Sequence, residues 1–114
     1  MLNILDKDLR MVVLNTEKQP NIYYISLGNF TKCTIETINI DNDILFRTYL
    51  QGDCTVEELT IIIDKFSDYI LSIKSEIEGI RLDADSNEML ESIGFKLKDD
   101  AYLYKKANRK LKRG

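Results

Sequence analysis

The sequence predicts an α+β fold: a mixed, mostly antiparallel sheet with one long and one short helix. Segments rich in Ile, Thr and Tyr fill the first half of the chain, and a strongly periodic helical segment follows Gly52. The 114 residues, 44% of them hydrophobic, are enough for one domain with its own core and too few for two ordinary domains. We therefore expect a single domain over residues 1–106 and a basic tail over residues 107–114.

Four strands are predicted before Gly52. They are expected at residues 10–14, 22–27, 33–40 and 44–50. In the second strand, Tyr23 and Tyr24 fall on opposite faces of the alternating pattern. Gly28-Asn29 is expected to loosen or bulge this strand, and Asp41-Asn42-Asp43 has the composition of a turn. Short links between three of these strands favour an antiparallel meander.

A long helix is predicted from Thr55 onward. Thr55 followed by Glu58 forms a capping box, in which the hydroxyl and the carboxylate satisfy free amides of the first turn. Apolar residues then recur on one face of about five helical turns. These residues are Val56, Leu59, Ile62, Ile63, Phe66, Ile70 and Ile73. We expect this face to pack on the sheet.

The rest of the chain predicts a strand, a short helix and a final extended region. The strand is expected at residues 77–83, and the helix at residues 86–93 with Ser86 or Asp85 as its N-cap. Gly94 stands where a left-handed residue commonly ends a helix. Residues 95–104 predict a strand pair or one long strand, interrupted at Asp99-Asp100.

Charge is unevenly distributed along the chain. The last ten residues hold six basic side chains and no acid, so the net charge of −3 leaves −9 on the first 104 residues. An acidic body argues against broad nucleic-acid binding by the body itself, while the basic tail is a candidate for weak nucleic-acid contact. The chain has no histidine and no closely spaced cysteine pair, so we expect no metal site.

Several features favour a cytoplasmic protein without a membrane segment. No stretch approaches the roughly 18 consecutive apolar residues that a membrane span needs. The N-terminus lacks a basic region followed by an apolar run, so no secretory signal is predicted. Cys33 and Cys54 lie far apart, and the composition is not that of a disulfide-stapled domain. We expect both thiols to be reduced, with Cys33 buried in a strand.

The segment Met89–Phe95 joins the short helix to the final strand region. It resembles the closing (aliphatic)-Tyr-Glu-x-(aliphatic)-Gly-Phe segment of the GNAT (N-acetyltransferase) superfamily. Ile80–Asp83 resembles the fifth strand of that family, and Ala101–Lys106 resembles its final strand. The resemblance covers residues 44–106 and implies an acyl-CoA acyltransferase-like fold.

The segment before the long helix stands where GNAT enzymes carry their pyrophosphate loop, (Arg/Gln)-x-x-Gly-x-(Gly/Ala). In that family, backbone amides at the helix N-terminus bind the diphosphate of acetyl-CoA. The resemblance implies that the cofactor-binding residues are Gln51, Gly52, Asp53, Cys54, Thr55 and Val56. Cys54 and Val56 replace residues that are small in the family, and glycine is what permits the close approach. Asp53 adds a negative charge, so the cofactor motif is degenerate.

The catalytic positions also depart from the family. Its usual general acid is a tyrosine four residues before the Gly of Gly-Phe, and Leu90 occupies that position. Glu36, which faces out of an otherwise apolar strand, is the candidate general base, and Tyr49 is the candidate acid. Cys54 lies at a helix N-terminus, which lowers thiol pKa, but no histidine is available as its base. Residues 1–21 are too few to supply the two early helices that form much of the family's acceptor site.

Two functions are compatible with this pattern, besides a nucleic-acid-associated adaptor that would use the basic tail. The departures at Asp53, Cys54, Val56 and Leu90 favour a GNAT-like domain that has lost acyltransferase activity and acts as a small protein-binding accessory or regulatory module. The alternative is an acetyl-CoA-dependent N-acyltransferase acting on an amine of a small molecule or protein. A splayed gap between the strands at 44–50 and 77–83, where the family seats pantetheine, would favour the enzyme. Richness in Ile, Asn, Lys and Asp is typical of a low-GC bacterial or phage genome.

Overall fold

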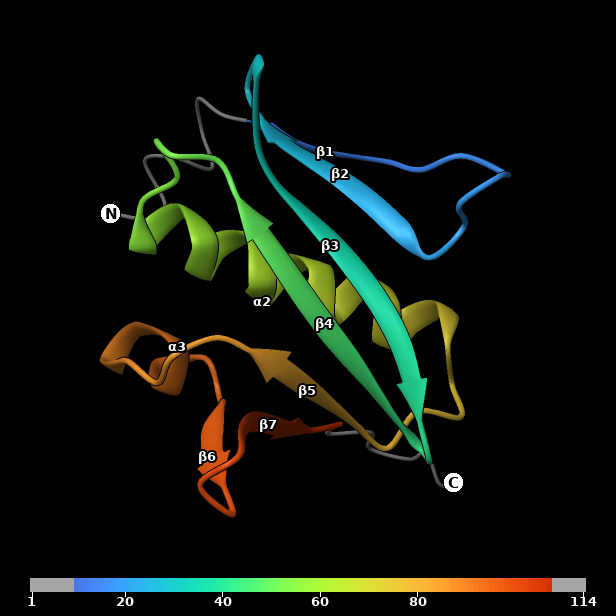
Figure 1. Cartoon of the computed structure of the whole chain (residues 1–114), viewed down its shortest axis with the longest axis vertical. Helices are drawn as coiled ribbons and strands as arrows, with labels where there is room; N and C mark the ends of the chain where they lie inside the picture. Colours follow the sequence, from blue (N-terminus) through green and yellow to red (C-terminus); the bar gives the residue numbers. More distant parts are fainter. Residues whose placement is uncertain (1–9, 108–114) are drawn as a thin grey trace.

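A seven-stranded sheet with two helices makes up the described part of the chain, residues 10–107 of a computed structural model (Figure 1). The strands are β1 (Met11–Leu14), β2 (Ile22–Leu27), β3 (Phe30–Ile40), β4 (Asp43–Leu50), β5 (Gly79–Asp83), β6 (Lys96–Lys98) and β7 (Tyr102–Lys106). The helices are α2 (Val56–Ile73) and α3 (Glu88–Ser92). The predicted α+β class, with one long and one short helix, is confirmed.

The strands follow the order β1-β2-β3-β4-β5-β7-β6. The first four form an antiparallel meander, which confirms the arrangement predicted for three strands and adds β1 at its edge. β4 and β5 are the one parallel pair among neighbouring strands of the described sheet, because α2 connects them as a crossover and returns the chain to the same end. β7 then pairs with β5 and with β6 in antiparallel fashion.

Two turn predictions need correction. Gly28-Asn29 is the two-residue loop of the β2–β3 hairpin, since Leu27 pairs with Phe30 and Gly28 has a φ of +63°. β3 therefore begins three residues earlier than predicted, and the irregularity of β2 lies between Ile25 and Ser26. The turn predicted at Asp41-Asn42 is present between β3 and β4, but Asp43 is not part of it. It pairs with Ile40 as the first residue of β4, and its carboxylate bonds side chains far away in the sequence.

The apolar stripe of α2 packs on the sheet as predicted. Phe66 lies at its centre, with ring centroids 5.0 Å from both Tyr23 and Phe46. The buried apolar side chains of the predicted stripe are Leu59, Ile62, Ile63, Phe66 and Ile70. The prediction is wrong for Val56 and Ile73, which are 51% and 52% exposed. They are the first and last residues of α2, so their side chains lie at the helix ends.

The C-terminal elements are shorter than predicted. α3 begins at Glu88, and its N-cap is Asn87 rather than Ser86 or Asp85, since the Leu90 N–H donates to Asn87 Oδ1 at 2.9 Å. Gly94 follows with a φ of +107°, as expected for the residue after a helix. Asp99-Asp100 forms the turn between β6 and β7, so the strand-pair alternative is the correct one.

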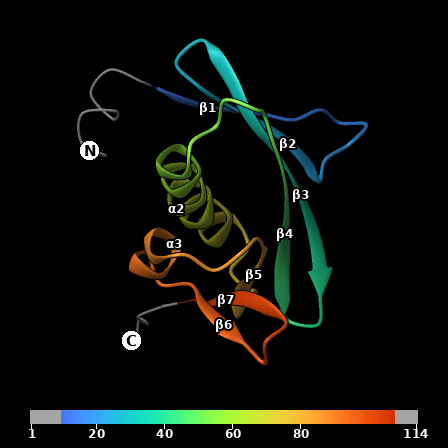
Figure 2. The same ribbon diagram turned by 60° about the vertical axis from the view of Figure 1, so that its left-hand side comes forward.

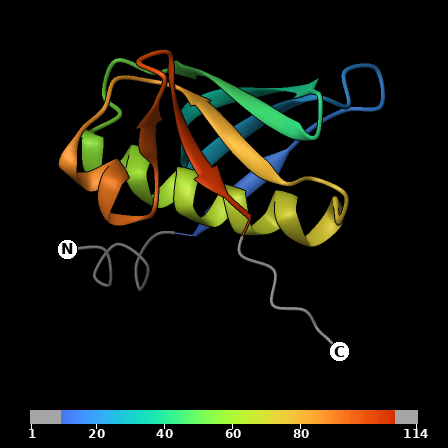
Figure 3. The ribbon, with the colours of Figure 1, turned by 90° about the horizontal axis from the view of Figure 1, so that it is seen from below.

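Both helices lie on the same side of the sheet (Figures 2 and 3). Ile35 and Phe46 point toward that side and are fully buried. Because side chains alternate along a strand, the neighbouring Glu36 and Arg47 point to the other side, which no described helix covers. We call these two surfaces the covered face and the open face.

Candidate functional site

The loop between β4 and α2 holds most of the predicted cofactor residues. It folds back on itself through a bond from the Cys54 N–H to the Gln51 carbonyl at 3.0 Å, and the Gln51 N–H donates to the carbonyl of Lys32 at 2.9 Å. Gly52 has no left-handed φ, and a Cβ there would meet no atom within 4 Å. The one glycine in this loop is therefore not required by the backbone.

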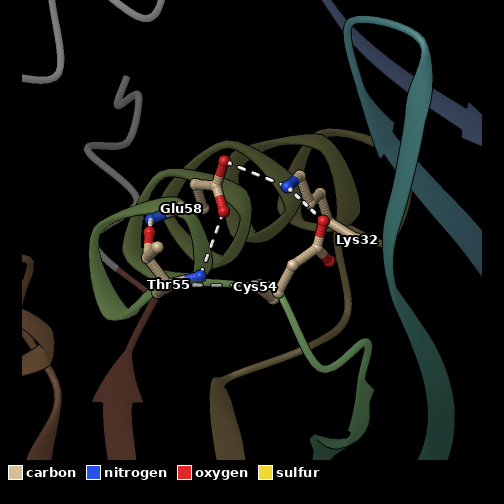
Figure 4. A network of polar contacts seen from close by, with 5 residues as sticks. Lys32, Cys54, Thr55 and Glu58 are labelled. Atoms are coloured by element: carbon tan, nitrogen blue, oxygen red, sulfur yellow. Dashed lines mark hydrogen bonds and ion pairs between the residues drawn. The ribbon is translucent and has the colours of Figure 1, made fainter.

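The N-terminus of α2 is closed by its own side chains (Figure 4). The Glu58 N–H donates to Thr55 Oγ1 at 3.1 Å, and the Thr55 N–H donates to Glu58 Oε1 at 3.0 Å, which confirms the predicted capping box. Glu57 adds another acid to the first turn. An incoming diphosphate would have to compete with these internal acceptors for amides at the helix start.

Lys32 on β3 is the cation of this cluster (Figure 4). Its ammonium lies 3.3 Å from Asp53 Oδ2 and 3.3 Å from Glu58 Oε2, and its side chain is only 10% exposed. Burial lowers the pKa of Lys32, but the hydrogen bonds to Glu58 and Asp53 outweigh burial and raise it overall. One charge thus serves two carboxylates and is not available to bind a phosphate.

Neither cysteine has the character of a nucleophile. Cys54 is half-buried, and burial followed by the charge of Glu58 raises the pKa of its thiol despite the opposing effect of Lys32. The expected lowering of the thiol pKa at the helix N-terminus is therefore wrong for Cys54. Burial raises the pKa of Cys33 to about 12, and both thiols are free. The prediction that Cys33 is a buried strand residue is confirmed.

The two candidate catalytic side chains lie together on the open face. The Tyr49 hydroxyl donates to Glu36 Oε1 at 3.5 Å, and Arg47 Nη1 lies 3.8 Å from the same oxygen. α2 and its N-terminus lie on the covered face, so the sheet separates this pair from the helix that would hold the cofactor. The structure joins Glu36 to Tyr49 but does not join either to the Thr55–Glu58 cluster.

Leu90, at the position of the family's usual acid, is a core residue. It is 0% exposed and belongs to the same hydrophobic cluster as Phe66 on α2. Phe95, the aromatic residue of the Gly-Phe segment, is also 0% exposed. These residues therefore hold α3 and the strand after it onto the covered face, and Leu90 offers no group that transfers a proton.

β4 and β5 diverge at their carboxyl ends. Their pairing ends at Arg47 and Asp83, while β4 continues to Leu50 along β3 (Figure 1). The Thr48 hydroxyl donates to the Asp83 carbonyl at 3.5 Å, just past the last pair. Tyr49 and Leu50 beyond this point are 52% and 48% exposed. The pairing of β4 with β5 therefore ends at Arg47 and Asp83, and β4 continues beyond it along β3.

A polar cluster on the open face was not predicted from the sequence. Asp43 accepts bonds from Arg81 Nε at 3.1 Å and from the Tyr104 hydroxyl at 3.0 Å. The Arg81 guanidinium also lies 4.8 Å from the ring centroid of Tyr102. A cavity of about 220 Å³ opens beside it, lined by Ile40, Leu45, Arg81, Asp83 and Tyr102. The partners come from β4, β5 and β7, so no local sequence signal could have found the cluster.

Comparisons with known proteins found no match for the chain among protein-family models, curated proteins or solved structures. Within residues 10–107, no three or more His, Cys, Asp or Glu side chains gather in a way that could hold a metal ion. No helix in that part of the chain has the length and hydropathy to span a membrane. The predicted basic tail falls almost wholly on residues 108–114, outside the described part.

Proposed function

We propose that this protein is a GNAT-like domain that has lost acyltransferase activity and acts as a small protein-binding accessory or regulatory module. The order of four strands, a long helix, a strand, a short helix and two strands supports the resemblance. So does the parallel pairing of β4 with β5 across the long helix. These features concern the fold alone, and the choice between the two functions is argued from the contacts of the loop and the helix N-terminus.

The main support for this proposal is the set of hydrogen bonds and ion pairs at the N-terminus of α2. A cofactor diphosphate would need free amides and a net positive or neutral surrounding. Here Thr55 and Glu58 cap the helix, and Asp53 and Glu58 share the charge of Lys32. Bringing a diphosphate to this position would place it beside at least two carboxylates, where like charges repel.

A protein-binding role is supported by the open face. No described helix covers this side of the sheet, and Tyr24 and Tyr49 are 40% and 52% exposed on it. Exposed aromatic side chains on a broad surface are typical of protein interfaces. The capped helix argues against cofactor binding, and the uncovered sheet offers a surface for a partner.

The alternative, an acetyl-CoA-dependent N-acyltransferase, is favoured by one observation. β4 and β5 part after Arg47 and Asp83, at the place where the family seats pantetheine. In this alternative, Tyr49 and Glu36 would serve as acid and base, since their side chains meet at 3.5 Å. They would have to act from the open face, however, because the residues of β4 on the covered face are Ile44, Phe46, Thr48 and Leu50.

Titration of the purified chain with acetyl-CoA by calorimetry separates the two functions. We expect no binding heat at millimolar ligand, and clear micromolar binding would overturn the proposed loss of activity. A variant combining Asp53→Gly, Cys54→Gly and Val56→Gly is the matched comparison, because it restores small, uncharged residues to the loop. Circular dichroism of both proteins checks that the variant is folded. Acetyl transfer to a panel of amines by the unmodified chain would support the alternative.

A further inference from the structure

The open face carries apolar side chains in addition to its charges. Leu14 is 60% exposed, Tyr24 40% and Tyr49 52%, and these residues lie in one row across β1, β2 and β4. The half-buried apolar residues on the same face are Val12, Ile22, Ile38, Ile40, Leu45 and Tyr102. Apolar surface contributed by five strands of the sheet is more than the scattered exposure usual for a monomer.

The centre of this face holds opposite charges that are only loosely paired. Glu36 on β3 and Arg47 on β4 are register partners, and Asp83 is the next residue in the same row on β5. The closest approach of Glu36 to Arg47 is 3.8 Å, and the Arg47 side chain is 45% exposed. Most of the guanidinium donors therefore point to solvent, since an arginine carries five N–H groups.

We propose that the open face binds the open face of a second copy of this chain, around a twofold axis between β3 and β4. An isologous contact needs a self-complementary patch. Glu36 and Arg47 form such a patch, because rotation about this axis places each carboxylate opposite the guanidinium of the other copy. The contact would be an aligned sheet-on-sheet packing, with strands crossing at about 30°.

The order of the strands fits this axis. β2 of one copy then lies over β5 of the other, and β1 over β7, so the uncharged strands meet the half of the face that carries the cavity. The cavity lining includes Ile40, Leu45 and Tyr102, which suit an apolar side chain such as Ile22 on β2, because Ile22 shares the row of Glu36 and so lies over Asp83 of the other copy. β6, which carries Lys96 and Lys98, stays outside the overlap. Its lysines are suited to an edge that remains in water.

The internal charge pairs of the face favour a second copy over a strongly charged partner. Glu36 lies opposite Arg47, and Asp43 bonds Arg81, so the centre of the face has little net charge to attract a nucleic acid. Strand spacing of about 4.8 Å and a rise of about 3.3 Å per residue give a face on the order of 30 Å by 20 Å. That is about the lower end of the area per partner in specific interfaces, so the face is large enough for a specific contact between two copies.

Sedimentation velocity of the full 13.2 kDa chain from micromolar to millimolar concentration tests the proposal. We expect a concentration-dependent shift to twice that mass. The variants Glu36→Arg and Arg47→Glu each put like charges on both sides of the axis, so each alone is expected to weaken association at least about tenfold. An equal mixture of the two variants is expected to associate again, because each carboxylate then meets a guanidinium.

This recovery in the mixture separates an interface from a folding defect, since a poorly folded variant would not be rescued by another. The exchanged protein, Glu36→Arg with Arg47→Glu, is expected to associate like the unmodified chain. Tyr24→Lys on the open face is expected to weaken association, whereas Tyr69→Lys, at a tyrosine 45% exposed on α2, is the matched control and should not. A chain that stays monomeric at millimolar concentration, or single variants that associate normally, would overturn the proposal. This proposal rests on the protein-binding role proposed above and names a second copy as the partner of the open face. Acetyl-CoA binding is measured separately, so the loss of acyltransferase activity and the association of two copies can fail independently.

Discussion

The covered face and the open face belong to the same strands but differ in what holds their side chains. On the covered face, Ile35, Phe46 and Phe66 are fully buried and fixed by packing. On the open face, the ordered contacts are polar, such as Asp43 with Arg81 and Tyr104, and many side chains remain partly exposed. The covered face therefore supplies most of the stability, and the open face is where substitutions can change interactions without unfolding the chain.

The largest effect is expected at the centre of the covered face. Phe66→Ala removes a ring that contacts Tyr23 and Phe46, and the resulting cavity should lower the free energy of unfolding by about 3–5 kcal/mol. Urea denaturation followed by circular dichroism measures this. Tyr69→Ala, on the same helix but 45% exposed, is the control and should cost much less. If both variants lowered the free energy of unfolding equally, the expectation that the buried ring contributes more than the exposed one would be wrong.

A smaller loss is expected from a glycine on the open face. A Cβ on Gly79 would overlap the phenol ring of Tyr104, which bonds Asp43. Gly79→Ala should therefore lower the free energy of unfolding by about 1–3 kcal/mol through crowding. In a Tyr104→Ala background the same substitution should cost little, because the ring is gone. A full cost in both backgrounds would show that Tyr104 is not the reason for glycine at this position.

Local patterns predicted the elements that depend on neighbouring residues. The α2 helix follows from its apolar period and from Thr55 and Glu58, which bond each other within one turn. The N-cap of α3 was predicted wrongly because Asp85, Ser86 and Asn87 are all good capping residues, and sequence alone does not rank three adjacent ones. In the structure Leu90 is buried in the core, and its N–H bonds Asn87 Oδ1, so Asn87 is the residue that caps the helix.

Contacts between distant residues could not be predicted in the same way. Asp43 has turn-forming chemistry, but its partners Arg81 and Tyr104 lie 38 and 61 residues away and become neighbours only in the sheet. Lys32 is a similar case, because Asp53 and Glu58 reach it only when α2 packs beside β3. In the candidate site, therefore, the loop before α2 and its capping box could be predicted from the sequence. The position of Lys32, which neutralises Asp53 and Glu58, could not.

The buried thiol of Cys33 on the covered face should make the stability of the chain depend on pH. Because burial raises the pKa of Cys33 from 9.0 to about 12, the unfolded thiol ionises first as pH rises above 9. The stabilisation from the buried thiol is complete below pH 9 and is lost between pH 9 and 12. Cys33→Ala should thus cost about 1 kcal/mol at pH 7, and this cost should shrink at pH 10.5. Urea denaturation at both values checks this, and a constant cost would contradict it.

The smallest effect is expected from Tyr49→Phe on the open face. The hydroxyl of Tyr49 is 3.5 Å from Glu36, and the ring is 52% exposed, so its removal should change the free energy of unfolding by less than about 0.5 kcal/mol. If the chain is a binding module, association of two copies should also survive, because the ring remains. If Tyr49 is instead the acid of an acyltransferase, the same variant should lose most of its transfer activity at unchanged stability. Measuring unfolding and acetyl transfer on one preparation therefore tests whether Tyr49 takes part in catalysis or only in binding.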